Sequence, residues 1–312
     1  MRTSDSLRKT YGETLVELGK DNKGLVMLEA DLGNSTMSGL FGAAYPERYF
    51  QMGIAEQNMA SVAAGLSLAG KIPFINSFAV FATGRAYDQI RSSVAIANLN
   101  VKICGSSAGL SDFGDGKTHQ SIDDIALMQV LPNMTVLSPC DAIETEKMTK
   151  AMVECNGPVY LRINRNDLPL VTDPKAEYHI GKMTEMVKGK DVVVFATGVM
   201  VQQSMEAAKI LEKEGISLRV VNVSTIKPLD ITALSSYCEG VKGVVTAEEH
   251  SIFGGLGSAV CSALSKKRLP IEVLGIQDSF GTSAENYSIL LKHYGLESED
   301  VAKKVRAVLS AN

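Results

Sequence analysis

The chain has 312 residues, of which 45% are hydrophobic and 21% are charged, with 27 Gly and 9 Pro. This length and composition suit about two soluble α/β domains with a sizeable buried core, and they exclude collagen-like, disordered and disulfide-scaffold proteins. The formal net charge is -4 and Lys and Arg form no long run. Both facts argue against a protein that binds nucleic acid through bulk positive charge.

The sequence carries no sign of export or membrane insertion. Residues 1–5 lead directly into an amphipathic helix, without the apolar segment of a signal peptide. The longest apolar candidate, Met59 to Gly70, is rich in Ala, Gly and Ser and falls short of the roughly 18 residues of a membrane span. The five cysteines are scattered without C-x-x-C spacing, which is typical of free thiols in a reducing compartment. The sequence therefore predicts a cytoplasmic protein that does not bind membranes.

Hydrophobic periodicity predicts alternating helices and strands in the first half of the chain. A helix begins near Leu7, and a long Gly/Ser/Asp loop ends near Gln120. Ser121 and Asp141 each stand three residues before an acidic residue, which predicts capping boxes at the starts of two helices. The other expected elements are strands over 24–29, 72–78, 101–105, 135–137 and 159–163, and helices over 57–68 and 82–97.

The same alternation returns in the second half. Strands are expected over 192–196, 218–223, 244–247 and 271–276, and helices over 201–215, from Asp230 and over 256–266. Alternation of this kind implies parallel sheets with helices on both faces. The prediction is an α/β protein of two doubly wound domains, residues 1–166 and 191–312, joined by a linker over 167–190.

Polar residues gather in three loops that follow expected strands, where open parallel sheets place their ligand sites. The loops cover residues 30–35, 53–58 and 111–120. Glu56 enters an otherwise Ala- and Gly-rich helix, so it is either a functional buried carboxylate or a carboxylate favoured by the helix dipole. Asp115 and His119 suit acid/base chemistry or hydroxyl recognition, although a solvated surface turn has the same spacing. No two histidines have metal-ligand spacing, so no metal site is predicted in this chain.

Several motifs, in order along nearly the whole chain, resemble the second half of transketolase. The motifs are Gly53-Ile54-Ala55-Glu56-Gln57-Asn58, the run from Phe78 to Gln89, Asp115-Gly116-Lys117-Thr118-His119-Gln120, Leu131-Pro132-Asn133-Met134, Gly157-Pro158-Val159-Tyr160 and Glu248-Glu249-His250. The resemblance implies a pyrimidine-binding domain followed by the transketolase C-terminal domain. A complete transketolase has a further N-terminal half, so the chain looks like the C-terminal subunit of a split transketolase.

The resemblance also implies the activity and the site residues. The enzyme would use thiamine diphosphate to transfer a two-carbon ketol unit from a ketose to an aldose. Glu56 would bind N1′ of the aminopyrimidine, and Phe78 and Phe81 would hold the ring. His119 would polarise or protonate the sugar oxygens. The remaining matched positions, Asp115, Arg165 and Ser35, would bind a substrate hydroxyl and the terminal phosphate of the sugar.

Three positions depart from the family pattern. Ser107 stands where family members usually carry a phosphate-binding His, which opens the choice of anionic end to a sulfonate, a branched sugar phosphate or a shorter substrate. Gly114 replaces the Glu of the family's Gly-Glu-Asp-Gly. Gly84 replaces an aromatic residue that lies beside the pyrimidine in many single-chain members.

The family's diphosphate and metal motif belongs to the half that this chain lacks. Gly114-Asp115-Gly116 imitates its start, but the Asn that should follow is missing. The resemblance therefore implies an N-terminal-half partner that brings Mg²⁺ or Ca²⁺, an A2B2 assembly, and an inactive isolated chain. The alternatives are a subunit like deoxyxylulose-phosphate synthase or like the β subunit of 2-oxoacid dehydrogenase, or a non-catalytic regulatory partner.

Overall fold

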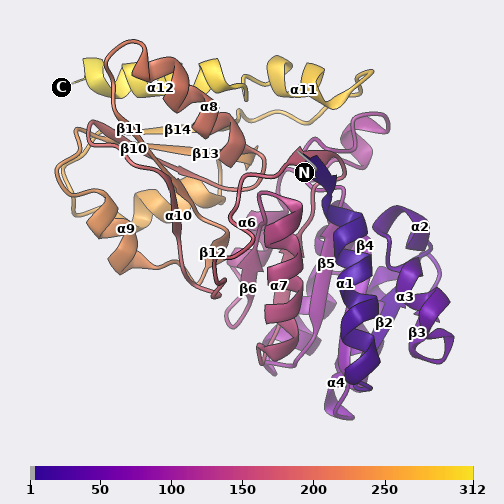
Figure 1. Cartoon of the computed structure of the whole chain (residues 1–312). Coiled ribbons are helices and arrows are strands. Elements are labelled where there is room, and N and C mark those ends of the chain that lie inside the picture. The colour runs from indigo at the N-terminus through magenta and orange to yellow at the C-terminus, as the bar shows by residue number, and fades with distance from the viewer. Residues whose placement is uncertain (1–3, 312) are drawn as a thin grey trace.

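The predicted alternation of strands and helices builds two mostly parallel sheets, one from each half of the chain (Figure 1). This confirms the predicted α/β class. The computed structural model describes residues 4–311. Residues 1–3, part of the segment in which no signal peptide is predicted, lie outside the described residues, as does residue 312. No helix within residues 4–311 has both the length and the apolar character needed to cross a bilayer.

The first sheet has seven strands in the order β12-β6-β7-β5-β4-β2-β3, all parallel to their neighbours except β12. Its strands are β2 (Leu25–Glu29), β3 (Tyr49–Gln51), β4 (Ile72–Phe78), β5 (Lys102–Ser106), β6 (Thr135–Leu137), β7 (Val159–Arg162) and β12 (Thr225–Lys227). Successive side chains alternate between two buried clusters: Met27 and Phe74 belong to one, and Leu28 and Ile75 to the other.

Helices cover both faces of this sheet. Helices α1 (Leu7–Asp21) and α7 (Ala142–Glu154) pack into the cluster of Met27. The other face is covered by α4 (Glu56–Leu68), the π-helical segments η2 (Val80–Arg85) and η3 (Ile90–Ala95), α5 (Tyr87–Gln89) and α6 (Asp124–Gln129). The short helices α2 (Gly33–Thr36), α3 (Gly39–Ala44), η1 (Pro46–Arg48) and η4 (Gly116–Thr118) lie in the connections.

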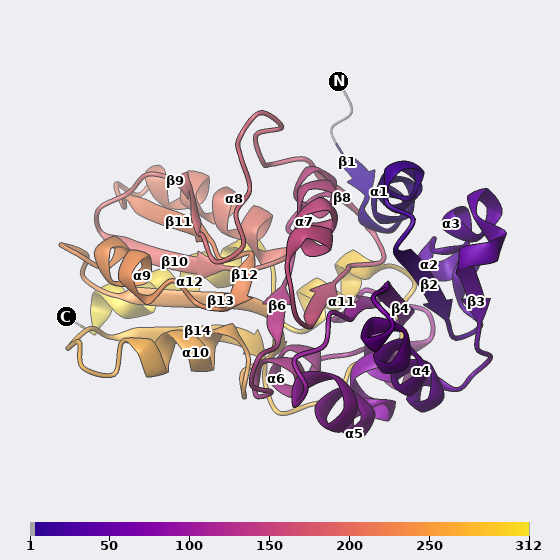
Figure 2. The ribbon, with the colours of Figure 1, turned by 90° about the horizontal axis from the view of Figure 1, so that it is seen from below.

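The second sheet has five strands in the order β14-β13-β10-β11-β9, with only β9 antiparallel to its neighbour. The strands are β9 (Thr184–Val187), β10 (Val192–Ala196), β11 (Leu218–Asn222), β13 (Val244–Ser251) and β14 (Ile271–Ile276). One face packs on α8 (Met200–Glu212) and α12 (Ser298–Ser310), and the other on α9 (Ile231–Tyr237) and α10 (Leu256–Ala263) (Figure 2). Helix α11 (Tyr287–His293) follows the sheet.

Strand pairing joins the two halves in addition to the chain itself. Strand β12 belongs to the second half by sequence, but it pairs antiparallel with β6 at the edge of the first sheet. Two strands, β8 (Asp167–Pro169) and β9, lie within the range predicted as a linker, and β8 pairs with β1 (Ser4–Ser6). The division of the chain at residues 166 and 190 stays a prediction.

Of the two predicted capping boxes, the one at Asp141 forms its N-cap but not the reciprocal bond to the backbone N of Asp141. Asp141 caps α7 by accepting from the backbone N of Glu144 at 2.8 Å, and the Glu144 carboxylate accepts from the backbone N of Cys140 at 2.9 Å. The box at Ser121 is wrong, because the backbone of Ser121 forms a bridge with Gly109 and α6 begins only at Asp124.

Candidate active site

The predicted site residues lie where the strands of the first sheet end. Phe78 is the last residue of β4, Ser107 follows β5, and Arg165 comes three residues after β7. Because the carboxyl ends of parallel strands meet at one edge of the sheet, residues far apart in sequence come together there.

Glu56 is the first residue of α4, and only 1% of its side chain is exposed. Its Oε2 accepts from Arg85 Nη1 at 2.7 Å, and its Oε1 accepts from Ser77 Oγ at 3.4 Å. A carboxylate at a helix N-terminus is favoured by the helix dipole, and a buried one needs a partner. Glu56 therefore combines both expected features, burial and a place at a helix N-terminus. The Arg85 side chain is 40% exposed, so solvent reaches the outer member of the pair.

Three rings form a cluster, and one guanidinium links this cluster to Glu56. The rings of Phe78 and Phe81 are nearly parallel, at 15°, with centroids 6.2 Å apart. The His119 ring turns its edge toward both, with centroids 6.1 Å from Phe78 and 5.4 Å from Phe81. The Arg85 guanidinium lies 4.6 Å from the Phe81 ring centroid, a cation–π distance. Arg85 thus contacts the carboxylate and the aromatic face together.

A second group of polar residues lies on the far side of Phe78. The guanidinium carbon of Arg165 is 5.7 Å from the Phe78 ring centroid. Arg165 Nη1 donates to Asp112 Oδ2 at 3.0 Å and to Ser107 Oγ at 3.5 Å. Arg8 Nε donates to the backbone O of Arg165 at 3.1 Å, and Arg8 Nη1 donates to the backbone O of Ser35. Arg8 therefore ties Ser35 to Arg165.

The second half of the chain supports the loop that carries Asp115 and His119. The backbone N of Ala284 donates to the O of Phe113 at 2.8 Å, and Gln120 Nε2 donates to the O of Thr282 at 2.9 Å. A Cβ at Gly116, where φ is +73°, would lie 2.4 Å from Ser283 Oγ. The loop is thus closely fitted to residues 281–284, which gives the C-terminal half a part in shaping the site.

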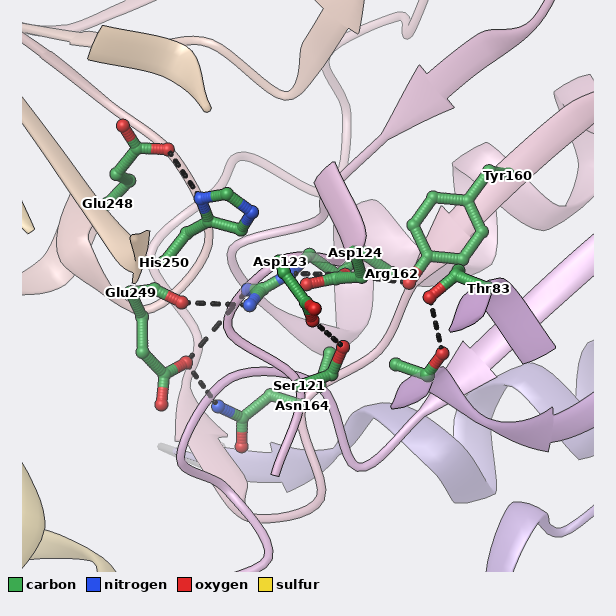
Figure 3. Close-up of polar contacts among 12 residues, drawn as sticks. Thr83, Ser121, Asp123, Asp124, Tyr160, Arg162, Asn164, Glu248, Glu249 and His250 are labelled. Carbon is green, nitrogen blue, oxygen red and sulfur yellow. Dashed lines mark hydrogen bonds and ion pairs between the residues drawn. The ribbon is translucent and has the colours of Figure 1, made fainter. Parts of the chain in front are cut away.

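A buried polar network joins the two halves (Figure 3). Arg162 Nε and Tyr160 Oη donate to Asp124 Oδ2 at 2.8 and 2.7 Å, and Arg162 Nη2 donates to the backbone O of Glu249 at 2.8 Å. The Glu249 carboxylate accepts from Tyr287 Oη at 2.7 Å. Burial raises the pKa of Glu249 to about 7, although Arg162 opposes the rise. These contacts join β7 and α6 of the first half to β13 and α11 of the second half.

Most of the residues predicted for the site form one string of contacts. Glu56 meets Phe81 through Arg85, Phe81 and Phe78 both meet His119, and Phe78 meets Arg165. Ser35 joins through Arg8. Asp115 is exposed at the start of η4. Burial is the largest cause of the raised pKa of Asp112, and the charge of Asp115 adds to the rise.

Three residues of this group were not predicted from the sequence. Arg85, Asp112 and Arg8 each contact a predicted residue directly. Asp112 stands in the same polar loop as Asp115, but nothing in the spacing distinguishes the carboxylate that pairs with Arg165. Arg8 lies in a helix 157 residues away from Arg165 in sequence, so no local pattern could indicate that contact.

Comparisons with known proteins place these features in a family. Residues 4–171 match the model of the transketolase pyrimidine-binding domain, and residues 181–301 match that of the transketolase C-terminal domain. A putative transketolase C-terminal section of Methanocaldococcus jannaschii is 44% identical, over 96% of this chain and 95% of that protein. One subunit of an apulose-4-phosphate transketolase of Phocaeicola vulgatus is 35% identical, over 95% of each.

A solved structure agrees with the sequence comparisons. A split-gene transketolase described as an inactive β4 tetramer is 46% identical, with a TM-score of 0.88 over 98% of both chains. Members of this family depend on thiamine diphosphate. The chain belongs to the transketolase family, and over almost its whole length it corresponds to the C-terminal section of a split transketolase.

Proposed function

We propose that this chain is the pyrimidine-binding subunit of a two-component transketolase, active only together with an N-terminal section. The reaction moves a two-carbon ketol unit from a ketose to an aldose. One observation carries the proposal: the buried Glu56 carboxylate accepts a hydrogen bond from a planar guanidinium that lies over the Phe81 ring.

The residues fit the aminopyrimidine of thiamine diphosphate. The Arg85 guanidinium stands in for such a ring, since it is planar, donates N–H to Glu56 and covers an aromatic face. A Cβ at Gly84, in the same turn, would meet no atom within 4 Å, so the space next to Gly84 is open. Glu56, Phe78 and Phe81 are the residues that would hold the ring.

When bound, the cofactor supplies the electron sink for breaking the carbon–carbon bond of the ketose. Glu56 would accept the hydrogen bond of the ring N1′–H and hold that proton in a site that water does not reach. Phe78 and Phe81 would fix the plane of the ring. His119, whose ring edge meets both phenylalanines, would exchange a proton with the sugar oxygens. Asp115 would accept from a sugar hydroxyl, and Arg165 and Ser35 would contact the distal end of the sugar.

The partner would supply the diphosphate-binding residues and the Mg²⁺ or Ca²⁺ ion. The resemblance to C-terminal sections supports this division of the site, because it assigns to another chain the half that binds the diphosphate. The inactive β4 tetramer of the split-gene relative supports a section that associates with itself but needs its partner for activity. We propose an A2B2 assembly.

The test co-expresses this chain with its own N-terminal section, as wild type and as Glu56→Gln. The matched control is Glu17→Gln, which makes the same change at a carboxylate that is 64% exposed. Ketol transfer should require both chains, and Glu56→Gln should lower kcat by about 100-fold or more because the amide cannot share the N1′ proton. Thiamine diphosphate titrations and size-exclusion chromatography should show that the variant still assembles. Full activity of Glu56→Gln would overturn the role of Glu56.

A further inference from the structure

The guanidinium at the distal end of the candidate site already has an anionic partner. Arg165 Nη1 donates to Asp112 Oδ2 at 3.0 Å, and the Asp112 side chain is only 4% exposed. Ser107 Oγ accepts a second hydrogen bond from the same nitrogen at 3.5 Å. The Arg165 side chain is 32% exposed, so the pair faces solvent through its arginine.

The charges around this pair nearly cancel. Arg8 and Arg165 contribute the positive charges, while Asp112 and the exposed Asp115 contribute the negative ones. Two donor nitrogens of Arg8 are already occupied, because Nε donates to the backbone O of Arg165 and Nη1 donates to the backbone O of Ser35. A sugar phosphate brings about −1.5 to −2 charges near pH 7. Bound to Arg165, it would lie close to the Asp112 carboxylate and compete with it for the same guanidinium.

A hydroxyl group suits the pair better than a phosphate. A hydroxyl can donate to a carboxylate and accept from a guanidinium at the same time, whereas a phosphate oxygen can only accept from Arg165. The Ser107 hydroxyl, which contacts Arg165, is an uncharged group that can likewise both donate and accept a hydrogen bond. The site therefore offers complementary contacts to a polyol and a repulsive one to a dianion.

We infer that Asp112 and Ser107 select a sugar whose distal end is an uncharged polyol over a sugar phosphate. The inference rests on the proposed function, since it concerns the substrate of that same site. It assigns Asp112 as a specificity-determining residue: the carboxylate neutralises the arginine that would otherwise attract a phosphate.

The test compares paired acceptors in the two-chain complex with thiamine diphosphate and Mg²⁺. Glyceraldehyde and glyceraldehyde 3-phosphate differ only at the distal end, and so do erythrose and erythrose 4-phosphate. The wild-type complex should give kcat/KM for the phosphorylated aldose no higher than for the free aldose. Asp112→Asn keeps the shape and removes the charge, and it should raise the ratio of phosphorylated to free aldose at least about tenfold, through KM. A wild-type preference for phosphate of about tenfold or more would overturn the inference.

Asp167→Asn is the matched control, because Asp167 is an exposed carboxylate near Arg8. Solvent screens its charge, so the acceptor ratio should change by less than about twofold. Inorganic phosphate gives a readout that needs no turnover: calorimetric titration of the complex should show weaker binding to wild type than to Asp112→Asn. Equal or stronger phosphate binding by the wild type would contradict the inference. Turnover with a phosphate preference would overturn this inference alone, whereas loss of cofactor binding by the complex would overturn the proposed function.

Discussion

At the scale of single residues, the Glu56–Arg85 pair has two opposite effects on cofactor binding. The guanidinium gives the buried carboxylate a hydrogen-bonding partner at 2.7 Å. The same guanidinium covers the Phe81 ring. An aminopyrimidine that bonds Glu56 and stacks on Phe81 must therefore displace Arg85, so that part of the binding free energy is spent on breaking this pair.

We expect Arg85→Ala to destabilise the cofactor-free protein and to strengthen cofactor binding. Removing the partner of the buried carboxylate should cost about 1–3 kcal/mol of folding free energy, and the cofactor no longer has a guanidinium to displace. Urea unfolding and calorimetric titration of thiamine diphosphate into the two-chain complex measure the two effects. Arg91→Ala, at an exposed arginine of η3, is the control and should alter neither. Weaker cofactor binding by Arg85→Ala would mean that Arg85 helps to hold the cofactor.

At the scale of secondary-structure elements, the sequence predicted most strands well and the segment after β4 less well. Strand β4 has the predicted bounds, 72–78, because a buried apolar run is easy to recognise. The helix expected over 82–97 instead contains the π-helices η2 and η3 with α5 between them. A six-residue π turn differs too little from the period of an α-helix to be seen in the sequence. Phe81 and Arg85 both lie in η2, four residues apart, a spacing that also brings side chains together in an α-helix.

The segment after β2 is another element whose folding depends on one residue. Glu29 is fully buried, and its Oε1 accepts from the backbone N of Ala30 and Leu32, each at 3.1 Å. Its Oε2 accepts from the hydroxyls of Thr36 and Ser38. Burial raises the pKa of Glu29 to about 7, with these hydrogen bonds acting against the rise. Glu29 thus organises the turn that carries Ser35.

This raised pKa predicts a pH dependence of stability. The folded protein holds the Glu29 proton up to about pH 7, while the unfolded chain releases it at about pH 4.3. The stabilising contribution is therefore complete below the lower value and lost as the pH rises through about 7, by up to about 4 kcal/mol. Urea unfolding of the wild type should show this fall between about pH 4 and 7, and Glu29→Gln, which cannot ionise, should show less of it. Identical pH profiles of stability for the two proteins would contradict the raised pKa of Glu29.

At the scale of the whole molecule, the site depends on contacts that no local pattern contains. The family resemblance predicted Glu56, Phe78 and His119 as site residues, because each lies in a recognisable motif. It did not predict that residues 281–284 would support the His119 loop, or that β12 would join the first sheet. Both contacts link the halves across long stretches of sequence. Both contacts depend on tertiary packing, which the hydrophobic periodicity of the sequence does not encode.

The network around Arg162 should contribute strongly to the stability of the joined halves. Asp124 and Arg162 are buried together, Asp124 accepts from two side chains, and Arg162 reaches the backbone of β13 in the second half. Asp124→Asn leaves the buried Arg162 charge with only the Glu249 carboxylate, 4.0 Å from its Nη1. Breaking a buried ion pair from one side costs about 3–5 kcal/mol.

Urea unfolding of Asp124→Asn, followed by circular dichroism, measures this cost. Glu206→Gln is the matched control, because it makes the same kind of change at an ion pair whose members are 68% and 47% exposed. Its unfolding midpoint should stay at the wild-type value, since water and salt screen such pairs. Asp124→Asn should shift the midpoint far more, and limited proteolysis should cut it faster between the halves. If the two variants unfold alike, the network does not hold the halves together, and the apolar cluster shared by both sheets must do so alone.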